Sequence, residues 1–290
     1  MLKVLVDTGS RKRIDGVEYL DALTGQKHIA TVGKKGRVLV CSGAYESPKL
    51  LMISRSAGWP NGIGNDHDLV GRFVVTHSIL KIRGTLNRNP ERWVQEYDFP
   101  TLMSRSWDTE WAQPKNKVFL FKNRKLPNLD IAGLMIQGKS RQEIDDILTT
   151  SRQSELQAFM EEMGRFENRL TLARGRTRFG LPKMRFDFTR PESTTRNGNE
   201  WLDKMEQVVL DMGYTIRNPK RDRGIGDPGG HHTTGTCRMA TSPEEGVTDE
   251  NLRVFGTDNL YVCSNAVFPS GSAVNPTLTL TALALSLIHI

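Results

Sequence analysis

The sequence predicts an α/β protein whose second domain is a sheet-based α+β domain. The apolar run from Arg37 to Cys41 is followed by the turn Ser42-Gly43-Ala44 and then by an apolar helix, which makes a strand–glycine turn–helix unit. A second strand end, Asn259 to Val262, is followed after a loop by an apolar helix from Thr277. Between these units, residues 79 to 121 spread aromatic side chains among polar ones without a helical period, which is typical of strands and loops.

The bulk composition fits a globular protein with a real core. Of the 290 residues, 37% are hydrophobic and 25% are charged. No run approaches the ~20 apolar residues that a membrane helix needs, and the N-terminal residues lack the apolar stretch of a secretory signal. The formal charge of +7 comes from short, scattered clusters without interleaved aromatic residues, which favours solvated surface over nucleic-acid binding.

The three cysteines do not form a recognisable framework. Cys41, Cys237 and Cys263 are far apart and include no C-x-x-C pair, so the sequence indicates neither disulfides nor a metal site. Cys41 and Cys263 lie in apolar strand-like runs, where cysteine behaves as a small hydrophobic residue. This usage mildly favours a reducing compartment such as the cytoplasm and leaves the localisation otherwise open.

Several further elements can be predicted in chain order. Residues 17–21 and 28–32 read as a hairpin around Thr24-Gly25. Ser47 is a good N-cap with Pro48 at the first helical position, and Gly58 ends that helix. The remaining expected elements are a helix from Arg141 to Met163, strands at 170–172 and 184–188 around Gly180-Leu181-Pro182, and a helix from Glu200 to Met212 that Gly213 caps.

The C-terminal region holds the candidate chemistry. It contains Gly229-Gly230-His231-His232-Thr233-Thr234-Gly235-Thr236, and later Asn275-Pro276-Thr277 at the start of an apolar helix that we expect to be buried up to Leu285. A helix N-terminus offers free N–H groups and a partial positive charge, which suits an anion. A neutral histidine can accept a proton near pH 7. Taken alone, however, a single histidine is more often structural, and Asn275 is a helix cap.

The order of these motifs resembles the C-terminal region of the glucose–methanol–choline (GMC) oxidoreductases. The resemblance rests on H-x-x-G-T-x-x-M from His232, on G-V-x-D-x-x-L-R-V-x-G-x-x-N-L-Y-V from Gly246, and on V-F-P followed by N-P-T-L-T. Val38 to Leu51 is similar to that family's S-A-G-A-x-x-S-P-x-L-L segment. Leu69-Val70-Gly71-Arg72 with His77 resembles its L-V-G-R-x-x-x-x-H stretch. Asn168-Arg169-Leu170 and Phe179-Gly180-Leu181-Pro182 resemble the bacterial sugar and polyol dehydrogenase branch.

The resemblance implies a partial FAD-binding, Rossmann-like domain joined to a sheet-based substrate domain, with FAD as cofactor. It places His232 as the base that takes the proton of a substrate CH–OH while hydride passes to flavin N5, with Asn275 as its partner. His231 is one position out of register. It also places Ser264, Asn265, Asn275, Pro276 and Thr277 around the flavin and pyrophosphate, and Ser42, Gly43 and Ala44 near the adenosine side.

The resemblance also sets the expected domains and ends. We expect residues 1–78 to be part of the FAD domain, 79–189 the substrate domain, and 190–285 the region that completes the FAD domain. Because no G-x-G-x-x-G occurs near the N-terminus, we expect the chain to begin partway through a longer protein. The final Leu-Ser-Leu-Ile-His-Ile matches a translation of the transposase-adaptor DNA CTG-TCT-CTT-ATA-CAC-ATC, so residues 286–290 are expected to be a non-native tail.

A further departure from the family pattern and two alternatives accompany this interpretation. Many relatives have aspartate where this chain has Ser264, which alters any polar contact there. The favoured function is FAD-dependent oxidation of an alcohol, sugar or polyol, with an electron-acceptor protein or quinone as a further partner. The first alternative is a non-catalytic, degenerate module that keeps the fold. The second, an NAD-dependent dehydrogenase, does not explain the H-x-x-G-T and N-P-T motifs.

Overall fold

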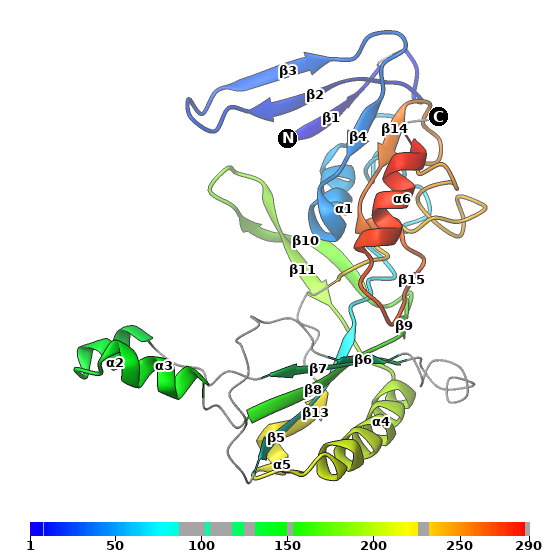
Figure 1. Cartoon of the computed structure of the whole chain (residues 1–290). Helices are drawn as coiled ribbons and strands as arrows, with labels where there is room; N and C mark the ends of the chain where they lie inside the picture. Colours follow the sequence, from blue (N-terminus) through cyan, green and yellow to red (C-terminus); the bar gives the residue numbers. More distant parts are fainter. Residues whose placement is uncertain are drawn as a thin grey trace. The chain divides into compact units, whose positions relative to one another are not determined.

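The computed structural model describes residues 1–7, 9–86, 102–104, 118–124, 131–149, 153–225 and 232–287. The chain divides into two compact units (Figure 1). The first unit comprises Met1–His77, Glu162–Thr189 and Gly230–Ile290, and the second comprises Ser78–Glu161 and Arg190–Gly229. Within the described residues, no helix is both long and apolar enough to cross a membrane.

An antiparallel sheet opens the first unit. Its strands are β1 (Lys3–Val6), β2 (Ile14–Leu20) and β3 (Lys27–Thr31), hydrogen-bonded in that order. The predicted hairpin is therefore confirmed, and its turn uses the left-handed backbone of Gly25, at φ 72°. Val4 and Ile14 are fully buried, whereas every residue of β3 is exposed. Of these three strands, only β1 and β2 therefore contribute buried side chains to the core.

Two parallel strands lie at the centre of the first unit. β4 (Val38–Val40) pairs with β14 (Leu260–Val262) in the register Val38↔Leu260 and Val40↔Val262. In Figure 1 the blue β4 and the orange β14 run side by side. Because the strands are parallel, their carboxyl ends meet at one edge, and helix α1 (Gly43–Ile53) starts there directly after β4. The predicted strand–glycine turn–helix unit is confirmed.

Helix α1 starts five residues before Pro48, the predicted first helical residue, so that Pro48 lies inside the helix, and it ends at Ile53 and not near Gly58 as predicted. An internal proline normally removes a hydrogen bond to the carbonyl four residues earlier, which here belongs to Ala44. The hydroxyl of Thr236 donates to that carbonyl oxygen at 2.7 Å. A side chain from a distant segment therefore supplies the donor that Pro48 lacks, and the helix tolerates the proline.

Shorter elements complete the first unit. The predicted strands around Gly180 are confirmed as the antiparallel pair β10 (Arg169–Arg176) and β11 (Pro182–Asp187). β9 (Glu162–Met163) pairs with β15 (Ser270–Gly271), and the short helix η1 (Asn265–Val267) follows β14. The C-terminal helix is α6 (Thr277–Leu287).

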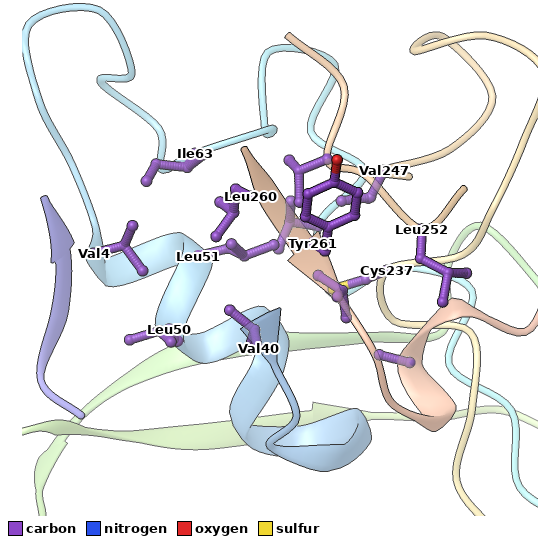
Figure 2. Packing of buried hydrophobic residues seen from close by; sticks show 14 of the residues in the cluster. Val4, Val40, Leu50, Leu51, Ile63, Cys237, Val247, Leu252, Leu260 and Tyr261 are labelled. Atoms are coloured by element: carbon purple, nitrogen blue, oxygen red, sulfur yellow. The ribbon is translucent and has the colours of Figure 1, made fainter. Parts of the chain in front are cut away.

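The core of the first unit joins residues from both ends of the sequence. Figure 2 shows side chains of β1, β4, α1 and β14 gathered with residues of the C-terminal loops. Apolar burial of this kind stabilises the unit by ~25 cal/mol per Å². The fully or nearly fully buried members include Val4, Val40, Leu51, Ile63, Val70, Cys237, Val247, Val254, Leu260 and Val262.

The second unit is built on an antiparallel sheet. Its strands are ordered β12 (Tyr214–Thr215), β5 (Ser78–Leu86), β8 (Gln153–Met160), β7 (Val118–Arg124) and β6 (Leu102–Ser104), and β13 (Arg223–Ile225) also pairs with β5. Helix α4 (Glu192–Asp211) packs on β5 and β8 through Trp201, Leu202 and Met205. The remaining helices are α2 (Ile131–Ile136), α3 (Arg141–Thr149) and α5 (Pro219–Asp222).

Three further sequence predictions differ from the structure. The helix expected from Arg141 to Met163 ends at Thr149, and residues 153–160 form β8, where Leu156, Ala158 and Met160 are buried at the period of a strand. The helix expected from Glu200 to Met212 is α4, which is longer and begins at Glu192. The apolar helix from Thr277 was expected to be buried, but Leu278 is 82% exposed and Leu287 is its one buried residue. Only the face through residues 280, 283, 284 and 287 is partly covered by the described residues.

The compact units also differ from the expected domain boundaries. Residues 162–189 belong to the first unit, because β9 pairs with β15 and β10 packs on α1. Residues 190–229 belong to the second unit, because α4, β12 and β13 pack on or pair with β5. The expected association of the N-terminal segment with the C-terminal segment is present for Met1–His77 and residues after 230, which share one core.

Candidate active site

The structure brings together the two predicted catalytic residues. Asn275 precedes α6, and its Nδ2 lies 3.2 Å from Nε2 of His232, although the two residues are far apart in the sequence. His232 adopts a left-handed backbone with φ 56°, which a non-glycine residue rarely occupies. Such strain persists only where surrounding contacts impose it, and it is concentrated at functional sites.

A loop anchored at two points holds His232 in place. Thr234 exchanges backbone hydrogen bonds with Val75, at 2.9 and 3.1 Å. Gly235 has φ 90°, and a Cβ added there would lie 2.1 Å from the carbonyl oxygen of Phe73, so a side chain cannot be accommodated. These contacts fix the loop against residues 73–77 and set His232 beside His77.

His77 is a third residue of the site. Its side chain is almost fully buried, its ring meets that of His232 edge-on with 5.0 Å between centroids, and the two Nδ1 atoms are 3.4 Å apart. Burial, and after it repulsion from His232, lower the pKa of His77 from 6.5 to about 4, although a backbone hydrogen bond with Ser272 opposes the shift. His77 is therefore neutral at pH 7.

The contacts define a tautomer for His232. An amide nitrogen can only donate, so the contact from Asn275 Nδ2 makes Nε2 of His232 the acceptor. A neutral His232 then carries its proton on Nδ1, which faces Nδ1 of His77. The lone pair needed to accept a substrate proton consequently stands on Nε2, on the side of Asn275.

The residues expected near the adenosine side lie at the carboxyl end of β4. Ser42 is exposed and makes no side-chain cap at the start of α1, where the first N–H groups have no partner within the helix. Gly43 has φ 71°, and a Cβ added there would meet nothing within 4 Å. Ala44 is buried and its carbonyl accepts the Thr236 hydroxyl.

The residues expected near the flavin lie after β14 and at the start of α6. The Ser264 hydroxyl accepts from the Ala266 N–H at 3.3 Å and contacts the Ser47 hydroxyl at 3.2 Å, so it caps the short helix η1. The Oδ1 of Asn265 is buried without a hydrogen-bond partner among the described residues. Pro276 is half-buried and Thr277 is exposed.

Some of the residues singled out in the sequence fall outside the described part of the chain. His231 and residues 288–290, including His289, lie outside the described residues. Among the residues that the structure does describe, no group of three or more His, Cys, Asp or Glu side chains is placed to hold a metal ion. The sequence named His77 only within a family pattern, and nothing in its spacing indicates that it meets His232.

Comparison with known proteins identifies the class of this region. Residues 165–284 match the family model of the GMC oxidoreductase C-terminal domain. Residues 165–284 are thus similar to the C-terminal domain of the GMC oxidoreductases, and the resemblance seen in the sequence is confirmed for this region.

Characterised relatives support the same assignment. The chain is 27% identical to 2-methyl-1,2-propanediol dehydrogenase of Mycolicibacterium austroafricanum over 93% of its length, and covers 49% of that protein. It is 26% identical to 6'''-hydroxyparomomycin C oxidase of Streptomyces lividus, with coverages of 94% and 47%. It is 24% identical to the fructose dehydrogenase large subunit of Gluconobacter japonicus, with coverages of 97% and 51%. The chain thus spans about half the length of these relatives.

A solved structure shares the fold. The crystal structure of pyridoxine 4-oxidase from Mesorbium loti matches 99% of this chain with a TM-score of 0.68 and 15% sequence identity, and the match covers 56% of that chain. At this identity the comparison supports the fold and not the substrate.

Proposed function

We propose that this chain is the C-terminal part of an FAD-dependent oxidoreductase that acts on the CH–OH group of an alcohol, sugar or polyol. The observation that carries the proposal is the pair His232 and Asn275, because it presents an imidazole lone pair beside an amide donor. The relatives include a 2-methyl-1,2-propanediol dehydrogenase and a fructose dehydrogenase large subunit, whose names agree with this substrate class.

The residues at the strand ends fit an FAD molecule. The carboxyl ends of parallel β4 and β14 meet beside the start of α1, which is where open α/β sheets bind nucleotides. The open space at Gly43 permits close approach of a ligand, and the buried Oδ1 of Asn265 lacks a donor that a ligand could supply. Ser42, Gly43 and Ala44 would hold the adenosine side, and Ser264, Asn265, Pro276 and Thr277 the flavin side.

The proposed chemistry divides between FAD and the protein. When bound, FAD supplies the N5 position that accepts the hydride. On substrate binding the Asn275 amide would move its hydrogen bond from Nε2 of His232 to the substrate oxygen, and the freed Nε2 lone pair accepts the hydroxyl proton of the substrate. General-base assistance of this kind is worth about 10²–10⁴-fold in rate.

His77 acts in this scheme as a positioning residue. Its neutral ring accepts the Nδ1 proton of His232, which keeps the lone pair on Nε2. Because its pKa is about 4, His77 does not compete with His232 for the substrate proton near pH 7. When His232 becomes an imidazolium, the uncharged neighbour adds no repulsion.

The N-terminal region of this sequence lacks the dinucleotide-binding fingerprint that the complete enzyme would need. A G-x-G-x-x-G segment at a helix N-terminus would supply the main pyrophosphate contacts, so we expect the 290-residue chain alone to bind FAD weakly. An electron-acceptor protein, a quinone or oxygen would reoxidise the flavin.

Purification of two proteins tests the proposal. One is the chain of residues 1–290, and the other is the same reading frame extended upstream of Met1 in the source DNA. The extended protein is expected to carry stoichiometric flavin absorbance and to lose it anaerobically on mixing with an alcohol or sugar. If the extended protein binds flavin but no alcohol or sugar reduces it, the non-catalytic module is correct. If it binds no flavin, the cofactor assignment is wrong.

A further inference from the structure

Two of the three cysteines occupy neighbouring positions in the fold. Cys41 directly follows β4 and Cys263 directly follows β14, and these strands are paired up to Val40↔Val262. The Cys263 N–H donates to the Val40 carbonyl at 3.0 Å, so the pairing continues to the cysteines. Their thiols are in hydrogen-bonding contact. Residues far apart in the sequence therefore form an in-register pair on one face of the sheet.

We propose that Cys41 and Cys263 are a modification site, which closes to a disulfide when it meets hydrogen peroxide or an organic hydroperoxide. Neighbouring strands lie ~4.8 Å apart, and disulfides join Cα atoms that are ~4.4–6.8 Å apart. Both thiols are free in the structure, and Cys41 is exposed while Cys263 is half-buried. The bond can therefore form with rotation of the side chains and little movement of the backbone.

The exposure of the two thiols sets the order of the steps. The Cys41 thiolate attacks one peroxide oxygen, the O–O bond breaks, and Cys41 becomes a sulfenic acid as water leaves from hydrogen peroxide, or an alcohol from an organic hydroperoxide. The Cys263 sulfur then attacks the Cys41 sulfur, so that the S–S bond forms, the S–O bond breaks and water leaves. In total, two thiols lose two electrons and two protons to one peroxide. Burial, followed by the charge and hydrogen bond of Cys41, raises the pKa of Cys263, which suits it to the second step.

Cys237 provides a matched control within the same chain. It is fully buried, and burial raises the pKa of its thiol far above the usual range. Its backbone N–H donates to Ala266, and its side chain belongs to the apolar core of the first unit. A thiol in such a setting is inert toward peroxide while the protein stays folded.

The pair lies beside the residues proposed to hold FAD. Cys41 precedes Ser42-Gly43, and Cys263 precedes Ser264-Asn265. If the proposed function holds, the disulfide would tie together the two segments on which the cofactor rests. Formation of the disulfide itself needs no flavin, so its test is separate from that of the proposed function.

The experiment uses the reduced 290-residue chain, treated with hydrogen peroxide and then alkylated in denaturant. We expect two of the three thiols to escape alkylation, a mass lower by two hydrogens, and a peptide that joins Cys41 to Cys263. Cys237→Ala should behave in the same way. In Cys263→Ser, Cys41 should stop at a sulfenic acid that dimedone traps, whereas Cys41→Ser should give neither product.

The controls show whether the folded structure selects the pairing of Cys41 with Cys263 or whether the thiols pair by random collision. The same oxidation in urea should give mixed pairings that include Cys237, because the fold no longer selects the partners. The proposal is overturned if the folded chain gives links through Cys237, links only between molecules, or a stable sulfenic acid at Cys41 with Cys263 still present.

Discussion

The hydroxyl of Thr236 has a role in stability that a single substitution can measure. It donates to the Ala44 carbonyl at 2.7 Å, in a place where Pro48 offers no N–H. Thr236 is fully buried and Ala44 is 5% exposed, so water cannot replace the bond. Thr236→Val keeps the shape of the side chain and removes only the donor.

The expected loss of stability follows from that burial. A buried acceptor left without a partner costs about 1–3 kcal/mol, so Thr236→Val should lower the free energy of opening of α1 by that amount. In a Pro48→Ala background, the new N–H at position 48 can bond to the Ala44 carbonyl as in any helix. In that background Thr236→Val should therefore lower the free energy of opening by at least ~1 kcal/mol less than it does in the unsubstituted chain. A coupling energy of this size is usual for residues that share a partner.

Native-state hydrogen exchange is the suitable assay, because the chain has two compact units and need not unfold in one step. The readout is the exchange of a peptide that covers Gly43–Ile53 in the four proteins of the cycle. Thr281→Val is the control, since its hydroxyl makes the same kind of bond to the Thr277 carbonyl at 2.9 Å on exposed α6. Thr281→Val should change the free energy of opening by less than about 0.5 kcal/mol. Equal costs of Thr236→Val in both backgrounds would refute the reasoning.

Three further predictions follow from the candidate site. In the complete, flavin-bound protein, Asn275→Ala should slow flavin reduction less than His232→Ala does, because the amide orients and does not accept the proton; stopped-flow rates compare them. Since the pKa of His77 falls from 6.5 to about 4 on folding, the unfolded chain binds more protons between those values, and stability should drop by about 3 kcal/mol as the pH falls through that range. In His77→Gln this pH-dependent loss of stability should disappear, and urea titrations at pH 7 and pH 4 measure it. His231→Ala should be milder than His232→Ala, and the reverse order of rates would place the base one residue earlier.

Part of the fold could be predicted because the decisive signals are local. The hairpin of β2 and β3, strand β4 and the pair β10 and β11 each carry their own alternation and turn residues. The start of α1 could not be predicted, since Thr236 replaces the hydrogen bond that Pro48 removes. The segment of β8 has apolar residues that also fit a helix, and its pairing with β5 and β7 decides the outcome.

The candidate site could likewise be predicted only in part from the sequence. His232 and Asn275 were reached through motif order, and the structure brings their side chains together. The contact of His77 with His232 depends on a loop anchored by Val75 and Gly235, which no spacing in the sequence indicates. The pairing of Cys41 with Cys263 likewise depends on the register of two strands from opposite ends of the chain.

The most direct test of the proposed function is anaerobic stopped-flow reduction of flavin in the reading frame extended upstream of Met1, with and without His232→Ala. Both proteins should bind FAD. With a saturating alcohol or sugar, the unsubstituted protein should reduce its flavin about 10²–10⁴-fold faster than the variant. Equal rates in two proteins that both bind flavin would contradict the assignment of His232 as the base.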